Sequence, residues 1–143
     1  QQTTRHTLHA VLTKIKITEK INGAVETHYG NGKLQSRANY KDDKLDGLCE
    51  TWHDNGQLLL RETYKDGKLD GVVETYCSEG KPKLRATYKN DKLDGLFEIW
   101  YDNGQPRTKV NYKNGKRDGL SERWNKDGNL VESTTYKNGE VVE

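Results

Sequence analysis

The tetrapeptide Lys-Leu-Asp-Gly (KLDG) occupies residues 44–47, 68–71 and 92–95, so it returns twice at an interval of 24 residues. Aligning the chain at that interval gives five units between Ile21 and Glu140. A fixed period of this length is the signature of a repeat protein, in which each unit is one supersecondary element that packs against its neighbours. The sequence therefore predicts a repeat architecture.

Several residue types recur in fixed columns of these units. Glycine fills one column at 23, 47, 71, 95 and 119 and a second at 32, 56, 80, 104 and 128. Glutamate recurs at 26, 50, 74, 98 and 122, and tyrosine at 40, 64, 88, 112 and 136. A further column holds the large aromatic residues Trp52, Tyr76, Trp100 and Trp124. Nine of the twelve aromatic residues lie in the last two columns, which excludes coincidence.

The composition limits the kind of fold that these units can build. The chain has 143 residues, a length typical of one domain. Only 31% of the residues are hydrophobic and 32% are charged, and the mean hydropathy is −1.10. So little apolar material cannot fill a thick two-layer core, but the regularly spaced aromatic residues are not typical of a disordered chain either. We therefore expect a thin sheet that is mostly solvated.

Charge and hydropathy exclude further classes. The net charge is +2 with interleaved signs, so the chain lacks the long-range field on which nucleic-acid binding depends. No run of eighteen apolar residues is present, so no membrane-spanning helix is predicted. Residues 1–5 are polar and residues 8–12 form too short an apolar run for a signal peptide, although the absence of an initiator Met leaves secretion open.

Each unit contains two turn signals. In residues 45–68 (LDGLCETWHDNGQLLLRETYKDGK) these are Asn55-Gly56 and Asp66-Gly67, and they flank segments of roughly seven or eight residues. Helices are excluded because glycine interrupts any apolar stripe of helical period. The sequence thus predicts an all-β fold, an elongated single-layer antiparallel β-meander of five 24-residue hairpin repeats.

The pairing register follows from the assumed turns. With a two-residue type I′ turn at Asn55-Gly56 and a four-residue loop at 66–69, Glu50 faces Arg61, and Arg61 also faces Glu74. Repetition of this pattern predicts a structural ladder of alternating charge: Glu26, Arg37, Glu50, Arg61, Glu74, Arg85, Glu98, Lys109 and Glu122.

A rival register with three-residue turns places Trp52 beside Leu58 but leaves Glu50 among apolar side chains. The first register is preferred because opposite charges across strands contribute about 0.2–1 kcal/mol each. An unpaired buried carboxylate costs several times more.

Two further rows follow from the preferred register. One is predicted to run beside the ladder and to contain Trp52, Leu59, Tyr76, Lys83, Trp100, Arg107 and Trp124. On the opposite face, tyrosine rings are expected to cover glycines, with Tyr64 facing both Gly47 and Gly71. KLDG is then the connection between one hairpin and the next.

The ends of the repeat array need separate interpretations. Residues 1–20 are predicted to be an N-terminal cap or edge strand, because Val11, Thr13, Ile15 and Ile17 alternate with polar residues. Residues 21–140 are the five repeats, and residues 141–143 are a truncated next repeat or the C-terminal edge. Because an uncovered edge strand invites pairing with another chain, an edge-strand homodimer stays open.

The N-G-K-(L/R)-D-G connection and the aromatic-x-x-N-G-Q hairpin resemble the MORN-repeat variant family, over about residues 20–143. More narrowly, the chain is similar to bacterial 24-residue repeat proteins, some exported and some grouped as antitoxins. The sequence differs from the commoner connection by Asp in place of His at 46, 70, 94 and 118, and by Glu79-Gly80 in place of Asn-Gly. The resemblance implies an elongated, curved sheet that acts as an interaction module without a catalytic site, and it favours an exported or cell-envelope location over the cytoplasm.

No motif for enzyme, metal or cofactor chemistry is apparent. The glutamate column is neutralised by interposed Arg and Lys, and the histidines His6, His9, His28 and His53 lack the partners of a metal site. Cys49 and Cys77 are expected about 16 Å apart, beyond the limit of about 7 Å for a disulfide, and so to be free thiols. Nucleophile and nucleotide-binding motifs are missing, so we expect no enzyme and no cofactor.

The aromatic and basic residues are the main candidates for function. The predicted partner-binding face consists of Trp52, Tyr76, Lys83, Trp100, Arg107 and Trp124. Such residues are enriched at protein interfaces, although rings that merely shield the sheet would give the same pattern. The expected function is a non-catalytic module that scaffolds or neutralises a protein partner. The alternatives are a membrane-surface or lipid-headgroup binder and a carbohydrate-binding surface protein.

Overall fold

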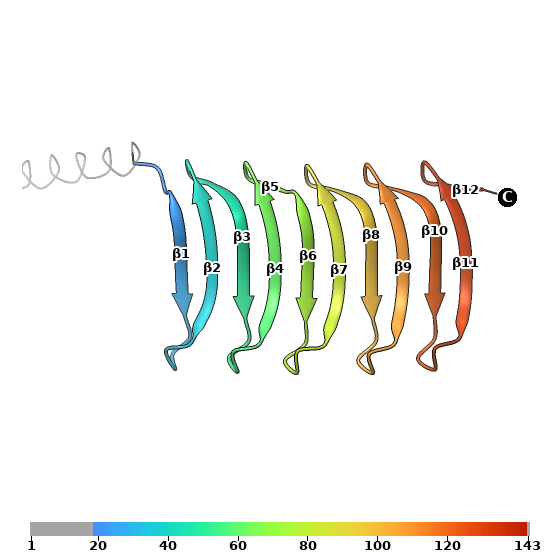
Figure 1. Cartoon of the computed structure of the whole chain (residues 1–143), viewed down its shortest axis with the longest axis horizontal. Coiled ribbons are helices and arrows are strands. Elements are labelled where there is room, and N and C mark those ends of the chain that lie inside the picture. Colours follow the sequence, from blue (N-terminus) through green and yellow to red (C-terminus); the bar gives the residue numbers. More distant parts are fainter. Residues whose placement is uncertain (1–18, 143) are drawn as a thin grey trace, which may run out of the picture.

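The computed structural model describes residues 19–142, and its strands form one open antiparallel sheet (Figure 1). The order is β1-β2-β3-β4-β6-β7-β8-β9-β10-β11-β12, with the short β5 paired to β4. The strands are β1 (Gly23–His28), β2 (Leu34–Lys41), β3 (Lys44–Trp52), β4 (Leu58–Lys65), β5 (Lys68–Leu69), β6 (Gly71–Tyr76), β7 (Pro82–Lys89), β8 (Lys92–Trp100), β9 (Pro106–Lys113), β10 (Lys116–Trp124), β11 (Leu130–Lys137) and β12 (Glu140–Val141). The prediction of an all-β meander of five hairpin repeats is confirmed.

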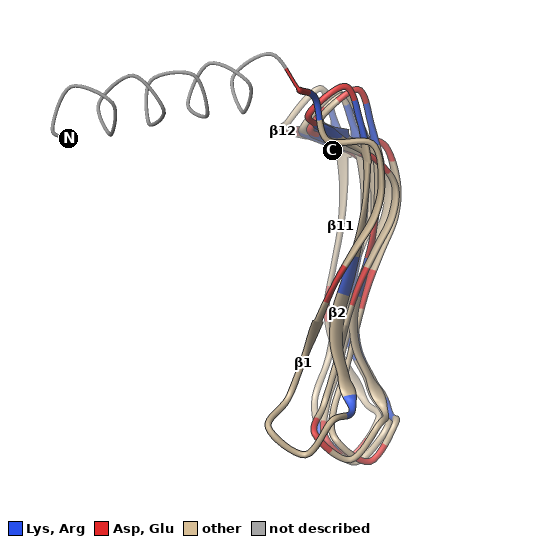
Figure 2. Cartoon of the chain, turned by 90° about the vertical axis from the view of Figure 1, so that its left-hand side faces the viewer, with Lys and Arg blue, Asp and Glu red and all other residues tan. Residues whose placement is uncertain are grey.

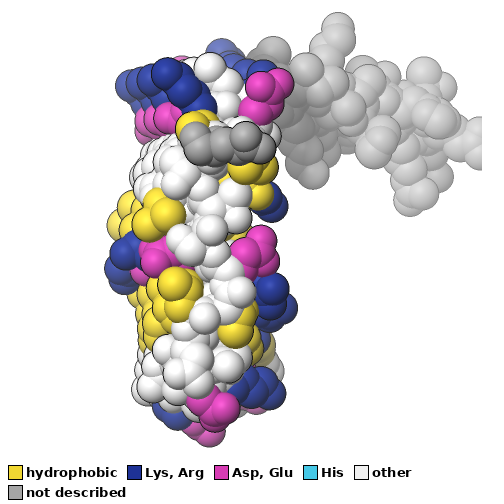
Figure 3. Space-filling model, turned by 90° about the vertical axis from the view of Figure 1, so that its right-hand side faces the viewer, with side chains coloured by type: hydrophobic (Ala, Val, Ile, Leu, Met, Phe, Trp, Pro, Cys, Tyr) yellow, Lys and Arg dark blue, Asp and Glu magenta, His cyan; other side chains and the backbone are white. Residues whose placement is uncertain are grey.

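The sheet is a single layer. Seen edge-on it is a thin, curved ribbon with charged residues at both ends of the strands and in a band between them (Figure 2). From the β11 end, apolar side chains lie on both broad faces (Figure 3). No helix of the described residues is long and apolar enough to cross a membrane.

The best-buried side chains form a row on one face. Val73 lies opposite Ala86, Ala86 opposite Phe97, and Phe97 opposite Val110. Among residues 19–142, the buried hydrophobic residues are Val73, Ala86 and Val110, and the Phe97 ring packs edge-on against Tyr112 with centroids 5.9 Å apart. Burying a valine fully contributes about 1.5–3 kcal/mol, so this central row stabilises the middle units more than the ends.

The turns after the aromatic column are wider than predicted. His53 N donates to Gln57 O (2.8 Å) and Gly56 N donates to His53 O (2.9 Å), which defines a three-residue turn at 54–56. Gly56 has φ +90°, whereas Asn55 is not in the positive-φ region that a type I′ turn requires. The predicted two-residue turn is wrong, and Trp52 lies opposite Leu58, as in the rival register.

The turns before KLDG are tighter than predicted. Asp66 and Gly67 have φ values of +50° and +82°, typical of a two-residue type I′ turn. Asp and Asn tolerate this region because their short side chains bond locally to the backbone. The predicted four-residue loop is therefore wrong, and Tyr64 pairs with Leu69 rather than with Gly71.

Neither turn error reaches the strand centres, because an irregularity beside each turn restores the predicted register. Glu50 faces Arg61 and Arg61 faces Glu74. All nine residues of the charge ladder lie opposite their neighbours in the expected order, as far as Glu122 opposite Lys109.

Next to the wide turns the register differs from the prediction. The residues opposite the aromatic column are Leu58, Pro82, Pro106 and Leu130. The predicted cross-strand neighbours Leu59, Lys83 and Arg107 are each displaced by the bulge. On the other face the tyrosine column does pair with glycine within each hairpin, as Tyr64 does with Gly47.

The two ends of the array differ in what the structure describes. The edge strand predicted for residues 11–17 lies outside the described residues. At the other end β12 pairs with β11, and Val142 N donates to Thr135 O (2.8 Å), so the chain follows the repeat path beyond residue 140.

Candidate partner-binding surface

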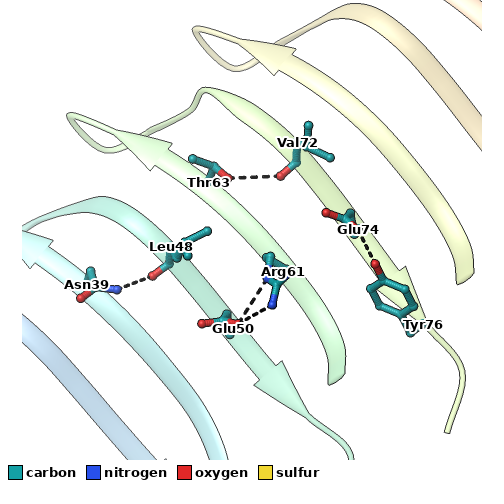
Figure 4. A network of polar contacts seen from close by, with 8 residues as sticks. All are labelled: Asn39, Leu48, Glu50, Arg61, Thr63, Val72, Glu74 and Tyr76. Carbon is teal, nitrogen blue, oxygen red and sulfur yellow. Dashed lines mark hydrogen bonds and ion pairs between the residues drawn. The ribbon is translucent and has the colours of Figure 1, made fainter. Parts of the chain in front are cut away.

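Among the described residues, three of the ladder's pairs within hairpins are ion pairs, whereas Glu98 and Lys109 lie opposite each other without an ion pair within 4.0 Å. Arg61 Nη2 lies 3.1 Å from Glu50 Oε2, and the guanidinium Nε is 3.3 Å from the same oxygen (Figure 4). The equivalent contacts of Arg37 with Glu26 and of Arg85 with Glu74 are 2.8 and 3.4 Å. Glu50 is only 14% exposed, so its pair is better shielded from water than that of Glu26, which is 39% exposed.

Tyr76 of the aromatic column is also part of this ladder. Its hydroxyl donates to Glu74 Oε2 (Figure 4). That hydrogen bond, together with burial, raises the pKa of Tyr76. The ring is therefore held against the sheet by a contact within its own strand, which supports a structural role at this position.

The aspartate of KLDG links consecutive tight turns at one edge of the sheet. Asp94 Oδ1 accepts from Asn114 N at 3.0 Å. Asp46, Asp70 and Asp118 make the same contact with the residue twenty positions later, at 3.3, 3.4 and 3.2 Å. We call this the tight-turn edge, with turns at 42–43, 66–67, 90–91, 114–115 and 138–139. Spacing alone did not reveal this role, because donor and acceptor lie twenty residues apart in the sequence.

The opposite edge is linked by side chains that reach the backbone of the following unit. We call it the wide-turn edge, with turns at 30–32, 54–56, 78–80, 102–104 and 126–128. The Tyr29 hydroxyl donates to Trp52 O. His53 Nε2 lies 3.0 Å from Tyr76 O, and the Tyr101 hydroxyl 2.7 Å from Trp124 O.

A second set of links comes from asparagines in the wide turns. Asn55 Nδ2 donates to Ser78 O at 2.7 Å, and Asn103 Nδ2 to Lys126 O at 2.9 Å. These side chains do not belong to any chemical motif, so sequence reasoning missed them. The sequence signal for the first set of links is the recurrence of a hydrogen-bonding residue at positions 29, 53 and 101, and for the second set it is the asparagine at positions 55 and 103.

Both sets of links are missing between the third wide turn (78–80) and the fourth (102–104). We call the place where these two turns meet the third joint. Cys77 occupies the column of Tyr29, His53 and Tyr101, and Glu79 occupies that of the asparagines. Within residues 19–142, no side chain donates to the carbonyl of Trp100 or of Asp102. A carboxylate cannot donate, and Glu79 instead contacts Lys81 at 3.8 Å.

Two hollows lie at this joint, and the larger is beside it. Its volume is about 720 Å³, and it is lined by Lys83, Leu84, Ile99, Trp100, Tyr101, Asp102, Asn103, Arg107 and Lys126. Three of the predicted partner-binding residues, Lys83, Trp100 and Arg107, therefore line one pocket. Trp52, Tyr76 and Trp124 do not line it.

A smaller hollow occupies the third joint itself. It has a volume of about 270 Å³ and is lined by Cys77, Ser78, Glu79, Lys81, Pro82, Lys83, Tyr101 and Asp102. Lys83, Tyr101 and Asp102 also line the larger pocket, so the two hollows adjoin. We refer to them together as the joint groove.

The groove is positively charged. Lys83, Arg107 and Lys126 have no carboxylate within 4.0 Å in the part of the chain that the structure describes. The Arg107 guanidinium lies 5.8 Å from the centroid of the Tyr101 ring, a cation–π contact. Asp102 is the acidic residue lining the larger pocket, so cations outnumber it there.

Metal-binding and redox groups contribute little to this surface. The described residues contain no cluster of three or more metal-ligating side chains, and His6 and His9 lie outside them. Cys49 and Cys77 are half-buried free thiols, and burial raises the pKa of Cys49.

Comparison with known proteins addresses the origin of the repeats. No curated protein matches the chain. The model of the MORN repeat variant matches five times, at residues 21–42, 45–66, 69–90, 93–114 and 117–138. These segments cover each hairpin together with its tight turn, which is the unit that the structure repeats. The chain therefore belongs to the MORN repeat variant family.

Proposed function

We propose that the chain is a non-catalytic module that binds a protein partner through the joint groove. Repeats of this family are generally protein- or membrane-interaction modules. In this proposal the sheet acts as a scaffold or as a neutralising binder, and the partner supplies any chemistry.

The observation that carries the proposal is the meeting of Lys83, Trp100 and Arg107 in one pocket of about 720 Å³. Tryptophan and arginine are over-represented among residues that dominate binding energy at protein interfaces. Such anchors act best in hollows, where a partner side chain excludes water from them. Trp52, Tyr76 and Trp124 of the same column do not line this pocket, whereas Trp100 does.

The proposal is tested by affinity capture from an extract of the source organism, followed by mass spectrometry. Immobilised wild-type chain is compared with Trp100→Ala and with Lys83→Glu/Arg107→Glu. Trp52→Ala is the matched control, because it removes a tryptophan of the same column that does not line the pocket. Far-UV circular dichroism and thermal unfolding check that each variant remains folded.

We expect one stoichiometric protein on the wild type and on Trp52→Ala. Its recovery should fall by about tenfold on Trp100→Ala, equivalent to a loss of about 1.4 kcal/mol. Equal recovery of the captured protein on all variants would mean that the partner binds outside the joint groove. Sedimentation with phosphatidylserine vesicles at physiological salt, in the absence of a captured protein, would instead favour the membrane-surface alternative.

A further inference from the structure

We propose that the joint groove holds an extended acidic segment of the partner, whose backbone amides donate to the carbonyls of Trp100 and Asp102. This inference rests on the proposed function and adds the chemistry of the bound segment. Three steps lead to it: the break in the wide-turn edge, the free acceptors that it leaves, and the charge around them.

At the third joint, three side-chain columns of the wide-turn edge lack the contact that they make at the second and fourth joints. Cys77 and Glu79 replace the donor side chains found at other joints. The third column gives the same result, because the side-chain amides of Gln57 and Gln105 lie against the glycines of the next turns. At the third joint Lys81 occupies that column, and no atom of the described residues lies within 4 Å of a Cβ placed on Gly104. The first joint, with Lys33 in this column and Gly56 beside it, is open in the same way, so the third joint is distinguished by lacking all three contacts at once.

The second step concerns the acceptors that the break exposes. Elsewhere on this edge, Tyr76 O accepts from His53 and Ser78 O accepts from Asn55. The corresponding carbonyls at the third joint belong to Asp102, which lines the hollow of about 270 Å³, and to Trp100, which lines the adjoining larger pocket. Backbone carbonyls are strong acceptors, and shielding them from water without a donor is costly. An extended polypeptide offers regularly spaced N–H donors, as in strand addition.

The third step is charge complementarity. Lys83, Arg107 and Lys126 surround the groove without carboxylate partners among residues 19–142, and Lys81 is paired with Glu79 in the smaller hollow. Asp102 and Glu79 together offset only part of the charge of these four cations. Trp100 and Ile99 add apolar surface to the same pocket. The favoured segment is therefore acidic and carries an apolar or aromatic side chain.

The test closes the groove with side chains that the protein already uses. Cys77→His/Glu79→Asn gives the third joint the side chains of the second joint, His53 and Asn55. These side chains should donate to the Trp100 and Asp102 carbonyls and fill the smaller hollow. The matched control, His53→Cys/Asn55→Glu, makes the reverse exchange one unit away and leaves the third joint unchanged.

Random dodecapeptides displayed on phage are selected on the wild-type chain, and the enriched peptides are measured by fluorescence polarisation. We expect enrichment of acidic peptides with an aromatic or large apolar residue. Their dissociation constant should rise by about tenfold on Cys77→His/Glu79→Asn, equivalent to about 1.4 kcal/mol, and change little on the control. Their affinity should also fall as salt is raised.

Enrichment of neutral or basic peptides, or no enrichment, would overturn the inference. Equal affinity for the wild type and the closed variant would do the same. Neither result overturns the proposed function, which depends on loss of the captured partner with Trp100→Ala. Binding of phosphatidylserine vesicles without selection of any peptide would assign the groove to an anionic headgroup instead.

Discussion

The two edges of the sheet carry the same number of turns but are linked in different ways. At the tight-turn edge the same contact recurs, with an aspartate that follows one tight turn accepting from the first amide of the next tight turn. At the wide-turn edge the equivalent column reads Tyr29, His53, Cys77, Tyr101 and Asn125. The contacts of the tight-turn edge are the same in every unit and specify how the units stack. The side-chain links of the wide-turn edge can differ from one unit to the next.

The difference has a backbone origin. At the tight-turn edge Gly67 N donates to Leu45 O (2.8 Å) and Gly115 N donates to Leu93 O (2.7 Å), so consecutive tight turns are joined by main-chain bonds. Among the described residues, no comparable main-chain bond joins neighbouring wide turns. Links made only by side chains can be lost at one joint without disturbing the others, as at Cys77.

The largest effect is expected for Gly71→Ala at the tight-turn edge. Gly71 has φ +129°, and a Cβ there would lie 3.0 Å from Thr63 Cβ. A non-glycine residue at strained backbone angles costs about 1–3 kcal/mol, and overpacking adds a similar amount. We expect unfolding in urea to show a loss of about 3 kcal/mol.

The matched change at the wide-turn edge is Gly104→Ala. Gly104 also has a positive φ of +87°, but no atom of residues 19–142 lies within 4 Å of the added Cβ. The cost should therefore be limited to backbone strain, about 1–2 kcal/mol. Equal losses for the two variants would contradict the view that units pack more closely at the tight-turn edge.

A smaller loss is expected for Asp94→Ala. The variant removes the carboxylate that accepts from Asn114 N at 3.0 Å, and a hydrogen bond of this kind contributes about 1 kcal/mol. Asp54→Ala is the control, since Asp54 is exposed in a wide turn and its side chain makes no hydrogen bond to the described residues. Thermal unfolding that shows equal effects would argue against the aspartate link.

Closing the third joint should act in the opposite direction. Cys77→His/Glu79→Asn adds donors for two carbonyls, and partly exposed hydrogen bonds contribute about 0.5 kcal/mol each. We expect the melting temperature to rise slightly, whereas Tyr101→Phe, which removes the bond to Trp124 O, should lower it. A closed variant less stable than the wild type would mean that the third joint cannot adopt the geometry of the second.

Much of the fold follows from sequence periodicity alone. Glycine spacing and the alternation of Glu with Arg placed Arg61 opposite both Glu50 and Glu74. The turn types were wrong, because Asn55-Gly56 is as compatible with a three-residue turn as with a type I′ turn. Cross-strand charge pairing determined the register at the strand centres. Bulges beside the turns absorbed the errors in the predicted turn lengths.

The site was less predictable than the fold. The sequence identified Lys83, Trp100 and Arg107, but it grouped them with Trp52, Tyr76 and Trp124 because they share a period. A period describes what units have in common, whereas the groove arises where unit three differs. Lys126 was missed for the same reason, since it departs from the residues of its column, and Tyr101 was missed because its column was not among those considered.

The smallest effect at neutral pH is expected near the tight-turn edge, at Tyr64. Burial raises the pKa of Tyr64 to about 12, assisted by its hydrogen bond to Glu62 (3.0 Å) and by that carboxylate's charge. In the unfolded chain the pKa is about 10. The folded state therefore resists ionisation, and the contribution is fully present below pH 10 and is lost as the pH rises through about 12.

Tyr64→Phe isolates this contribution, because the other tyrosines and lysines titrate alike in both proteins. The stability advantage of the wild type should be constant up to about pH 10 and then decrease, since only the wild type must keep a phenol protonated in order to stay folded. Urea unfolding of both proteins at increasing pH measures the difference. A difference independent of pH would mean that the Tyr64 hydroxyl is solvated, and that the tyrosine over Gly47 shields the sheet less than its pairing indicates.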